Sequence, residues 1–258
     1  MFARSPLTPC EPLRETTGLP YNKAPNTDLK GSIVMRIRHK PWARPELAAC
    51  PFFIDDPTQL KGGWKNALAH PERPLHLELG CGKGGFVAAM SVRYPEVNFI
   101  AVDIKSEMLG LAKRNVEKAH LAENTPVENV LLTAHDIELL PKIFDENDAP
   151  DRIYINFCNP WPKPKHHKKR LTHTRQLAAY KGFMRDGAEL WFKTDSEPLF
   201  LGTRRYLEEA GGFEVRYLTS DLHHSGFEES LPTEHERMFS EQGLPIYFLI
   251  AVYHKQQP

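Results

Sequence analysis

From Pro74 to the end of the chain, short apolar runs alternate with amphipathic stretches. The apolar runs have the length of strands and predict seven of them, at residues 75–79, 97–102, 129–134, 152–157, 188–193, 213–219 and 246–253. The stretches with helical periodicity predict helices at residues 85–93, 106–119, 172–183 and 197–210. Strands and helices that alternate in this way form a parallel sheet covered on both faces. We therefore predict a single α/β domain over residues 60–258, with a mostly parallel seven-stranded sheet.

The first 59 residues lack this alternation. Residues 1–34 are rich in Pro, Thr and Asn without a helical or strand period, so we expect a flexible tail or an over-extended start. Residues 35–59 form a basic N-terminal segment that contains Arg36, Arg38, His39, Lys40 and Arg44. No signal-peptide pattern is present, and the longest apolar run, residues 246–253, is far short of the ~20 residues that a membrane helix needs.

The composition indicates a soluble globular protein and does not indicate a particular binding partner. The 258 residues are 41% apolar and 26% charged, and 33 Lys and Arg balance 33 Asp and Glu, as in an ordinary soluble domain. The four cysteines lie far apart without a C-x-x-C pair. This spacing argues against a zinc module and favours a reducing, cytoplasmic location.

The balanced total charge hides an uneven distribution. Residues 152–185, the acid-free stretch, contain no Asp or Glu and nine Lys and Arg. Together with the basic N-terminal segment, this stretch is either a solvated surface or a binding strip for a polyanion such as RNA. Charge alone leaves both interpretations open.

The sequence LHLELGCGKGG at residues 75–85 runs from a predicted strand through a glycine turn into a predicted helix. Gly80, Gly82 and Gly85 satisfy G-x-G-x-x-G, which occurs in cofactor-binding turns and also where glycines only serve packing. Glu78 distinguishes between two candidate cofactors, a dinucleotide and S-adenosyl-L-methionine. Its carboxylate would repel a dinucleotide phosphate at the helix N-terminus, whereas the sulfonium and ammonium of S-adenosyl-L-methionine would be attracted. We therefore predict that Glu78, Gly80 and Gly82 bind S-adenosyl-L-methionine.

Two further acids follow the next two predicted strands. Asp103 ends the second strand, where a carboxylate can accept both ribose hydroxyls, and Asp136 follows the third, within reach of an adenine amino group. Each acid alone is also a candidate helix cap. One acid at the end of each of three successive strands is the arrangement of a Rossmann-like class I methyltransferase, with helices on both faces of the sheet.

A loop of prolines and basic residues follows the fourth predicted strand. Loops at this edge of an open α/β sheet border the ligand, and the prolines at positions 160, 162 and 164 stiffen this one. Trp161 is a candidate for stacking on a base and equally for structural burial. Residues 165–170 supply charges for RNA phosphates. The histidine pairs 166–167 and 223–224 lack the carboxylates or thiolates of a metal site, so we predict no metal.

Five motifs in order give a specific resemblance. They are MRIRHKPWA (35–43), ELGCGKG (78–84), PWPK (160–163) with its basic continuation, FKTD (192–195) and TEHE (233–236). Over about residues 35–253 the chain resembles the bacterial tRNA (guanine-N7)-methyltransferase family, which modifies guanine 46 in the variable loop. The resemblance implies contacts to the methyl donor or the reacting site at Glu78, Asp103, Asp136 and Asn159. It implies contacts to the nucleotide substrate at Lys163, Asp195, Thr233, Glu234, His235 and Glu236. It implies contacts to the RNA at Lys165, His166, His167, Lys168, Lys169 and Arg170.

Three positions depart from the family's pattern: Asn159 stands where Asp is usual, Cys158 where Pro is common, and His235 where an aromatic residue is usual. Guanine N7 carries no proton, so its methylation needs no general base, and position 159 orients the base and stabilises developing positive charge. Asn159 keeps an acceptor oxygen and lacks the charge. We expect an active methyltransferase, slower than an Asp-bearing relative, in which Asn159 orients the base; the alternative is that Asn159 only starts the proline turn.

The sequence leaves other functions open. The Asn159-Pro160-Trp161 loop resembles the Asn-Pro-Pro-aromatic loop of enzymes that methylate amines. A non-catalytic protein that binds S-adenosylmethionine and RNA fits the same residues, and Glu78 disfavours a nicotinamide dehydrogenase. The predicted partner is tRNA, with no membrane and no metal, and a homo-oligomer is neither indicated nor excluded.

Overall fold

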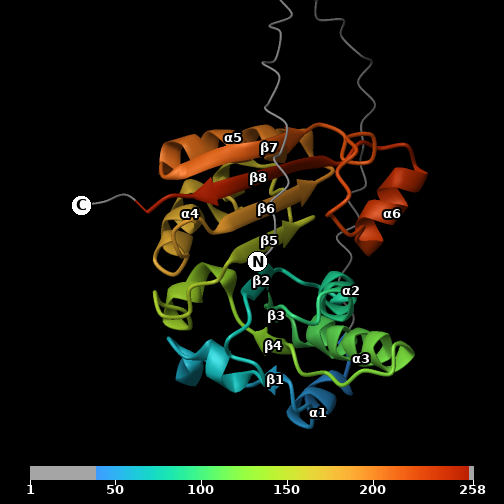
Figure 1. The fold of residues 1–258 in the computed structure, drawn as a ribbon. Coiled ribbons are helices and arrows are strands. Elements are labelled where there is room, and N and C mark those ends of the chain that lie inside the picture. Colours follow the sequence, from blue (N-terminus) through green and yellow to red (C-terminus); the bar gives the residue numbers. More distant parts are fainter. Residues whose placement is uncertain (1–38, 256–258) are drawn as a thin grey trace, which may run out of the picture. The chain divides into compact units, whose positions relative to one another are not determined.

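A sheet of eight strands runs through residues 39–255, the part of the chain that the computed structural model describes (Figure 1). The strand order is β1-β4-β3-β2-β5-β6-β8-β7. β8 is antiparallel to β6 and β7, and the other neighbours are parallel. The strands are β1 (Phe53–Ile54), β2 (Leu75–Leu79), β3 (Asn98–Asp103), β4 (Val130–Ala134), β5 (Arg152–Asn156), β6 (Glu189–Thr194), β7 (Phe213–Thr219) and β8 (Tyr247–Tyr253).

The helices fall into two groups. They are α1 (Ala43–Ala48), α2 (Gly85–Arg93), α3 (Ser106–Ala122), α4 (Thr174–Lys181), α5 (Glu197–Ala210) and α6 (Glu234–Glu241). α2 and α3 connect strands that advance toward β1, whereas α4 and α5 connect strands that advance toward β7. Because parallel crossovers are right-handed, the two pairs cover opposite faces of the sheet. The contacts agree, since α3 packs on α1 and α2, and α4 packs on α5.

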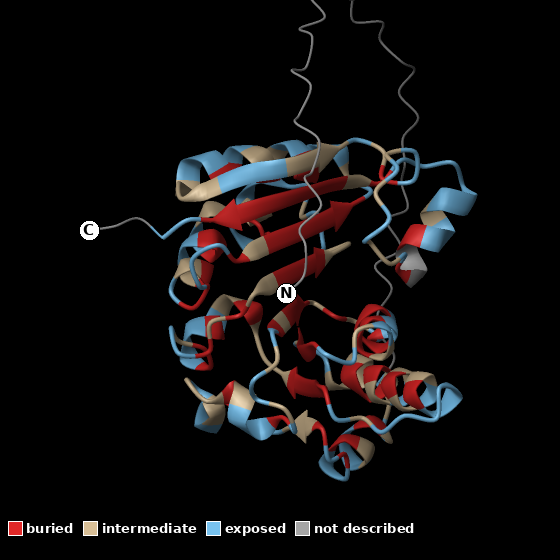
Figure 2. Ribbon diagram, in the orientation of Figure 1, coloured by how far each residue is buried: buried red, intermediate tan, exposed pale blue. Residues whose placement is uncertain are grey.

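The inner strands are continuous apolar runs because both of their faces are covered. Every residue of β3 before Asp103 is buried, as are residues 248–253 of β8 (Figure 2). β7 lies at the edge of the sheet, and three of its residues, Glu214, Val215 and Arg216, are exposed. The mostly parallel α/β architecture predicted from the alternating pattern is confirmed.

The sheet has eight strands rather than the predicted seven. The additional strand, β1, has two residues and pairs with β4, so it is too short for a periodic pattern. α1, α6 and four 3₁₀ helices among the described residues were not predicted, and the predicted helix at 172–183 is the shorter α4. His173 begins α4 by accepting a hydrogen bond from the amide of Arg175 (3.2 Å).

The described part of the chain begins at His39 and ends at Lys255. Residues 39–59, set apart in the sequence as a basic segment, contribute α1 and β1 to the compact unit that starts at His39. The predictions for residues 1–34 and for Arg36 and Arg38 lie outside the described residues. Within residues 39–255, no helix combines the length and the apolar character needed to span a membrane.

Parallel pairing brings the carboxyl ends of several strands to one edge of the sheet. Leu79 of β2 pairs with Val102 of β3, and Asp103 pairs with Ala134 of β4. On the other side of β2, β5 continues the sheet to β6. The loops that follow these strands therefore lie side by side, at the edge where open α/β sheets bind ligands.

Candidate active site

The turn between β2 and α2 is held against the end of β3. Gly80 and Gly82 have φ angles of 76° and 55°, a left-handed backbone that favours glycine. The amide of Gly80 donates to the carbonyl of Val102 (2.8 Å), and the amide of Gly82 donates to Oδ2 of Asp103 (2.9 Å). This turn lines a cavity of about 200 Å³, the Glu78 cavity, together with Glu78, Met108, Asn156, Phe157 and Thr233.

Glu78 is buried, and one of its two carboxyl oxygens has no hydrogen-bond partner among the described residues. Only 4% of the residue is exposed, and Oε1 accepts a hydrogen bond from Nδ2 of Asn156 (3.3 Å). Oε2 is buried without a hydrogen-bond partner among residues 39–255. Burial raises the pKa of Glu78 to about 8, although the hydrogen bond from Asn156 opposes the shift. A buried acid that lines a cavity and has one oxygen without a hydrogen-bond partner is suited to bind a cation.

The other two predicted donor-site acids hold backbone turns at the same edge. Asp103 is half-buried, and its Oδ1 accepts from the amide of Lys105 (2.9 Å) while Oδ2 binds Gly82. Burial raises the pKa of Asp103. Asp136 caps the 3₁₀ helix Ile137–Lys142 by accepting from the amide of Glu138 (2.9 Å). Neither residue is among the described residues that line the Glu78 cavity.

The loop after β5 has an unusual backbone. Phe157 and Trp161 have φ angles of 50° and 42°, a region that non-glycine residues enter at a cost in strain. Asn159 is exposed, and its Oδ1 accepts a hydrogen bond from the amide of Trp161 (3.0 Å). Asn159 therefore forms the turn that its Asn-Pro sequence predicts. Lys163 is exposed where the 3₁₀ helix Pro164–Lys169 begins.

The first turn of α6 is fixed by a capping box and a buried ion pair. Oγ1 of Thr233 accepts from the amide of Glu236 (3.0 Å), and Oε2 of Glu236 accepts from the amide of Thr233 (3.2 Å). The same Oε2 lies 2.8 Å from Nζ of Lys193, which also donates to the carbonyl of Leu231 (2.9 Å). Burial lowers the pKa of Lys193, and the Glu236 carboxylate opposes that shift. Glu236 is thus an interior residue rather than a surface acid.

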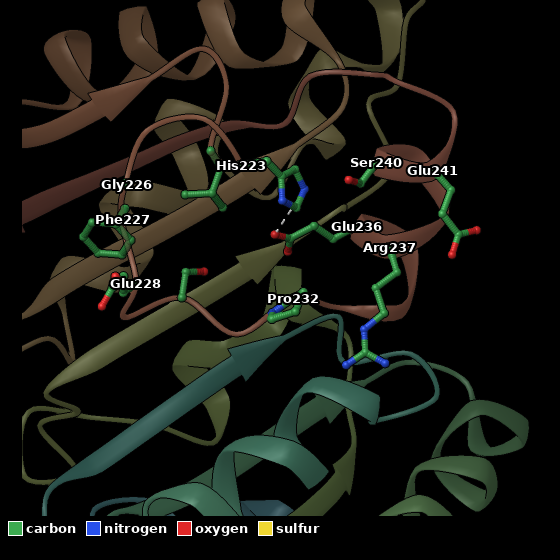
Figure 3. Close-up of a pocket in the computed structure, with 11 residues that line it drawn as sticks. His223, Gly226, Phe227, Glu228, Pro232, Glu236, Arg237, Ser240 and Glu241 are labelled. Carbon is green, nitrogen blue, oxygen red and sulfur yellow. Dashed lines mark ion pairs between the residues drawn. The ribbon is translucent and has the colours of Figure 1, made fainter.

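A second cavity, the α6 cavity, lies between residues 222–232 and α6 (Figure 3). Its volume is about 450 Å³, and its lining includes His223, Pro232, Glu236, Arg237 and Ser240. Nε2 of His223 points at Oε1 of Glu236 across 3.7 Å. Because Thr233 lines the Glu78 cavity and Glu236 lines the α6 cavity, the first turn of α6 borders both.

Three further predicted substrate residues are Asp195, Glu234 and His235, and the structure describes the side chain of Asp195 alone. Asp195 is exposed just after β6, and it does not cap α5, because Ser196 does so by accepting from the amide of Leu199 (3.4 Å). Glu234 and His235 belong to the first turn of α6, and their side chains lie outside the described part of the structure.

Comparisons with known proteins agree with this geometry. A family model described as "Putative methyltransferase" matches residues 72–249. A Clostridium botulinum (strain Alaska E43 / Type E3) protein named tRNA (guanine-N(7)-)-methyltransferase is 55% identical over 218 residues, covering 84% of this chain and 99% of that protein. A protein of the same name from Ruminiclostridium cellulolyticum is 54% identical over 220 residues, covering 85% and 92%. The chain belongs to the tRNA (guanine-N7)-methyltransferase family.

The fold of this tRNA (guanine-N7)-methyltransferase family member also matches a solved structure. The crystal structure of the 16S rRNA methyltransferase KamB superimposes with a TM-score of 0.51 over 70% of this chain and 88% of that one, at 14% identity. At this identity the likeness concerns the fold alone. The class I methyltransferase architecture predicted from the three strand-end acids is confirmed.

S-adenosylmethionine is the methyl donor of this tRNA (guanine-N7)-methyltransferase family. The residues present fit it on one direct observation: Oε2 of Glu78 is a buried acceptor without a partner among the described residues, on the wall of a cavity beside a glycine turn. A sulfonium or ammonium near that oxygen would satisfy it and stabilise the carboxylate.

The basic run of this family member divides into exposed and buried charges. Lys165, Lys168 and Lys169 are exposed, and His166 and His167 are half-buried. Nζ of Lys169 lies 5.1 Å from the centroid of the Trp161 ring. Arg170 differs, because it is 4% exposed and its guanidinium donates to backbone carbonyls. The Arg170 charge is used inside the protein in this structure, and the RNA contact at Arg170 stays a prediction.

The sequence analysis of this methyltransferase family member missed two residues that contact the acids of the site. Lys193, in the run ELWFKT, and Asn156, at the end of β5, bind Glu236 and Glu78. The available signal was a lysine within an apolar strand, because a buried lysine needs a partner. Among the described residues, no group of three His, Cys, Asp or Glu is placed to hold a metal ion, and the ring of His224 pairs with Asp221 (2.7 Å).

Proposed function

We propose that this protein transfers a methyl group from S-adenosyl-L-methionine to N7 of guanine 46 in the variable loop of tRNA. The observation that carries the proposal is that the capped, acid-bearing first turn of α6 borders the Glu78 cavity. The chain is also about 55% identical to a protein named tRNA (guanine-N(7)-)-methyltransferase. With tRNA as its substrate, the proposed location of the enzyme is the cytoplasm.

The donor side of the site uses residues at three strand ends. Glu78, Gly80, Gly82, Asp103 and Asp136 would hold the donor, with Asn159 at the reacting side. When bound, S-adenosylmethionine supplies an electrophilic methyl group on a sulfonium. The buried Glu78 carboxylate is the group in this chain that favours a positive charge in that cavity.

The substrate side needs orientation rather than proton transfer. N7 of guanine has a lone pair and no proton, so the new N–C bond would form without a general base as the S–C bond to the methyl group breaks and the sulfonium leaves as a neutral thioether. The Watson–Crick edge of guanine offers N–H donors, which carboxylates such as Asp195 and Glu236 accept. Lys163, Thr233, Glu234 and His235 complete the proposed substrate contacts, and residues 165–169 the proposed contacts to phosphates.

The test is methyl transfer to an unmodified tRNA transcript, with the modified base identified by mass. We expect 7-methylguanosine at position 46, and no product on a transcript with adenosine at that position. Methylation of an exocyclic amine would favour the amine-methylating alternative suggested by the Asn159-Pro160-Trp161 loop. Tight S-adenosylmethionine binding with no transfer to any tRNA would support the non-catalytic binding protein.

A further inference from the structure

Arg170 is a buried arginine at the end of the basic run. Nε donates to the carbonyl of Pro160 (2.8 Å) and NH2 to the carbonyl of Trp161 (3.4 Å). NH1 donates to the phenol oxygen of Tyr206 in α5 (3.3 Å). A guanidinium removed from water is tolerated only when its donors are used. Here two of the donors bind backbone carbonyls of the loop that carries Asn159, and a third binds Tyr206.

The segment that Arg170 holds needs external support. Trp161 has a φ of 42°, and strained backbone persists only where the surroundings impose it. Two contacts impose it here: Oδ1 of Asn159 accepts from the amide of Trp161, and Arg170 binds the carbonyls of Pro160 and Trp161. The loop is therefore held by the side chain of Asn159, which belongs to it, and by Arg170, which in turn contacts Tyr206 of α5.

α5 is shaped to accept this guanidinium. Gly202 and Tyr206 are one helical turn apart on α5 and so share one of its faces. A Cβ on Gly202 would lie 2.9 Å from NH1 of Arg170, so the guanidinium would have to shift to make room for it. A glycine inside a helix is unfavourable, and the space it leaves for Arg170 is a physical reason for its presence.

From these contacts we propose that Arg170 is a positioning residue for the reaction: anchored in a socket formed by Gly202 and Tyr206, it fixes the Pro160–Trp161 backbone and thereby the place of Asn159. The inference rests on the proposed function, because Asn159 matters only if the loop borders the reacting groups. The inferred role of Arg170 differs from that of Lys168 and Lys169, whose exposed charges can contact phosphates.

The test compares Arg170→Lys, Arg170→Met and Gly202→Ala with wild type, using an unmodified tRNA transcript and saturating S-adenosylmethionine. We expect each variant to lower the single-turnover methyl-transfer rate by roughly 10- to 100-fold, because small displacements of reacting groups are that costly. The dissociation constant for tRNA and its salt dependence should stay at the wild-type values. Gly202→Ala is informative because Gly202 makes no proposed contact to RNA or donor. The control is Arg216→Met, which removes an exposed arginine of β7 and should leave the rate unchanged.

A second readout does not depend on activity. Hydrogen exchange at the amide of Trp161, which donates to Oδ1 of Asn159, should be faster in Arg170→Lys and Gly202→Ala than in wild type and Arg216→Met. A wild-type transfer rate in Arg170→Lys and Gly202→Ala would overturn the inference. A salt slope lowered by about one unit in Arg170→Met would also overturn it, because that result identifies a phosphate contact. An inactive wild type would instead refute the proposed function, while faster exchange in the variants would still support the hold of Arg170 on the loop.

Discussion

Nζ of Lys193 lies 2.8 Å from Oε2 of Glu236, and 2% and 3% of the two side chains are exposed. The pair joins the middle of the sheet to the first turn of α6, which borders both cavities of the site. Lys193 also binds the carbonyl of Leu231 in the segment that leads to α6. The position of the proposed substrate motif therefore depends on a lysine from a neighbouring motif.

Removal of one partner of this pair should be costly. Lys193→Met leaves a buried carboxylate without its cation, so we expect the free energy of unfolding to fall by about 3–5 kcal/mol. The double variant Lys193→Met/Glu236→Gln removes both charges and should recover much of that loss. Denaturant unfolding measures both values. Arg205→Met, which breaks the exposed pair with Glu209, is the control and should cost no more than about 0.5 kcal/mol. Equal losses for Lys193→Met and Arg205→Met would show that the Lys193–Glu236 pair is not an interior one.

Donor binding should release a proton at neutral pH. Burial raises the pKa of Glu78 to about 8, so the free protein holds this group mainly protonated at pH 7. A bound cation favours the carboxylate and lowers the pKa again. We expect release of up to about one proton and an affinity for S-adenosylmethionine that rises with pH through the range of about 6 to 8.

Calorimetry in two buffers that differ in ionisation enthalpy measures this release. Glu78→Gln has the same shape without the titrating group, so subtracting its proton release corrects for ionisation of the ligand itself. Proton release that is identical in wild type and Glu78→Gln would rule out Glu78 as the group that meets the cation.

Asp103 should contribute to donor affinity both directly and through the turn. Asp103→Ala removes a carboxylate expected at the ribose and the acceptor for the Gly82 amide. We expect binding of S-adenosylmethionine to weaken by about 1–3 kcal/mol, the scale for a hydrogen bond to a charged group. Asp103→Asn keeps an acceptor oxygen and should be intermediate. Unchanged donor affinity in a folded Asp103→Ala protein would remove Asp103 from the site.

Periodicity predicted the inner sheet well because burial on both faces leaves a continuous apolar run. β2 and β7 match their predicted bounds, and so do α2 and α5. The missed elements carry no such pattern. β1 has two residues, and α6 presents a polar sequence whose start is set by the Thr233–Glu236 capping box. Such local hydrogen bonding is visible in a sequence only as a Thr-x-x-Glu spacing.

The site was predictable where a residue type alone implies a role. Glu78 before a glycine turn implied a cation, and the structure places that carboxyl group on a cavity wall, with Oε2 lacking a hydrogen-bond partner among the described residues. The burial of Arg170 was not predictable, because a run of basic residues does not show which side chain turns inward. Its burial depends on Gly202 and Tyr206, more than 30 residues later in the chain. Contacts of this kind come from tertiary packing and leave no local signal.

The exposed charges of the basic run should bind tRNA phosphates. The double variant Lys168→Gln/Lys169→Gln is expected to weaken tRNA binding and to lower the salt slope by roughly 1.5 units, since each phosphate contact contributes about 0.7–0.9. Affinity for S-adenosylmethionine should be unchanged. Binding measured at several salt concentrations provides the slope. A slope equal to that of wild type would mean that these two lysines are only solvated.

Asn159 combines two roles that the structure allows to be separated. Its Oδ1 accepts from the amide of Trp161, so it forms a turn, and the family's Asp can accept the same hydrogen bond. The difference between Asn and Asp at this position is therefore charge, whereas the difference between Asn and Ala is the turn together with the orienting oxygen.

We expect Asn159→Asp to keep the loop and to raise the rate of methyl transfer, because a carboxylate stabilises the positive charge that develops on the guanine imidazole ring. Asn159→Ala should lower the rate, since Trp161 loses one of the two contacts that hold its left-handed backbone. Single-turnover transfer to one unmodified tRNA compares the three proteins, and Trp161 amide exchange reports the state of the turn. An Ala variant as fast as wild type would exclude the orienting role. An inactive wild type rescued by Asp would show that the chain is not an enzyme as it stands.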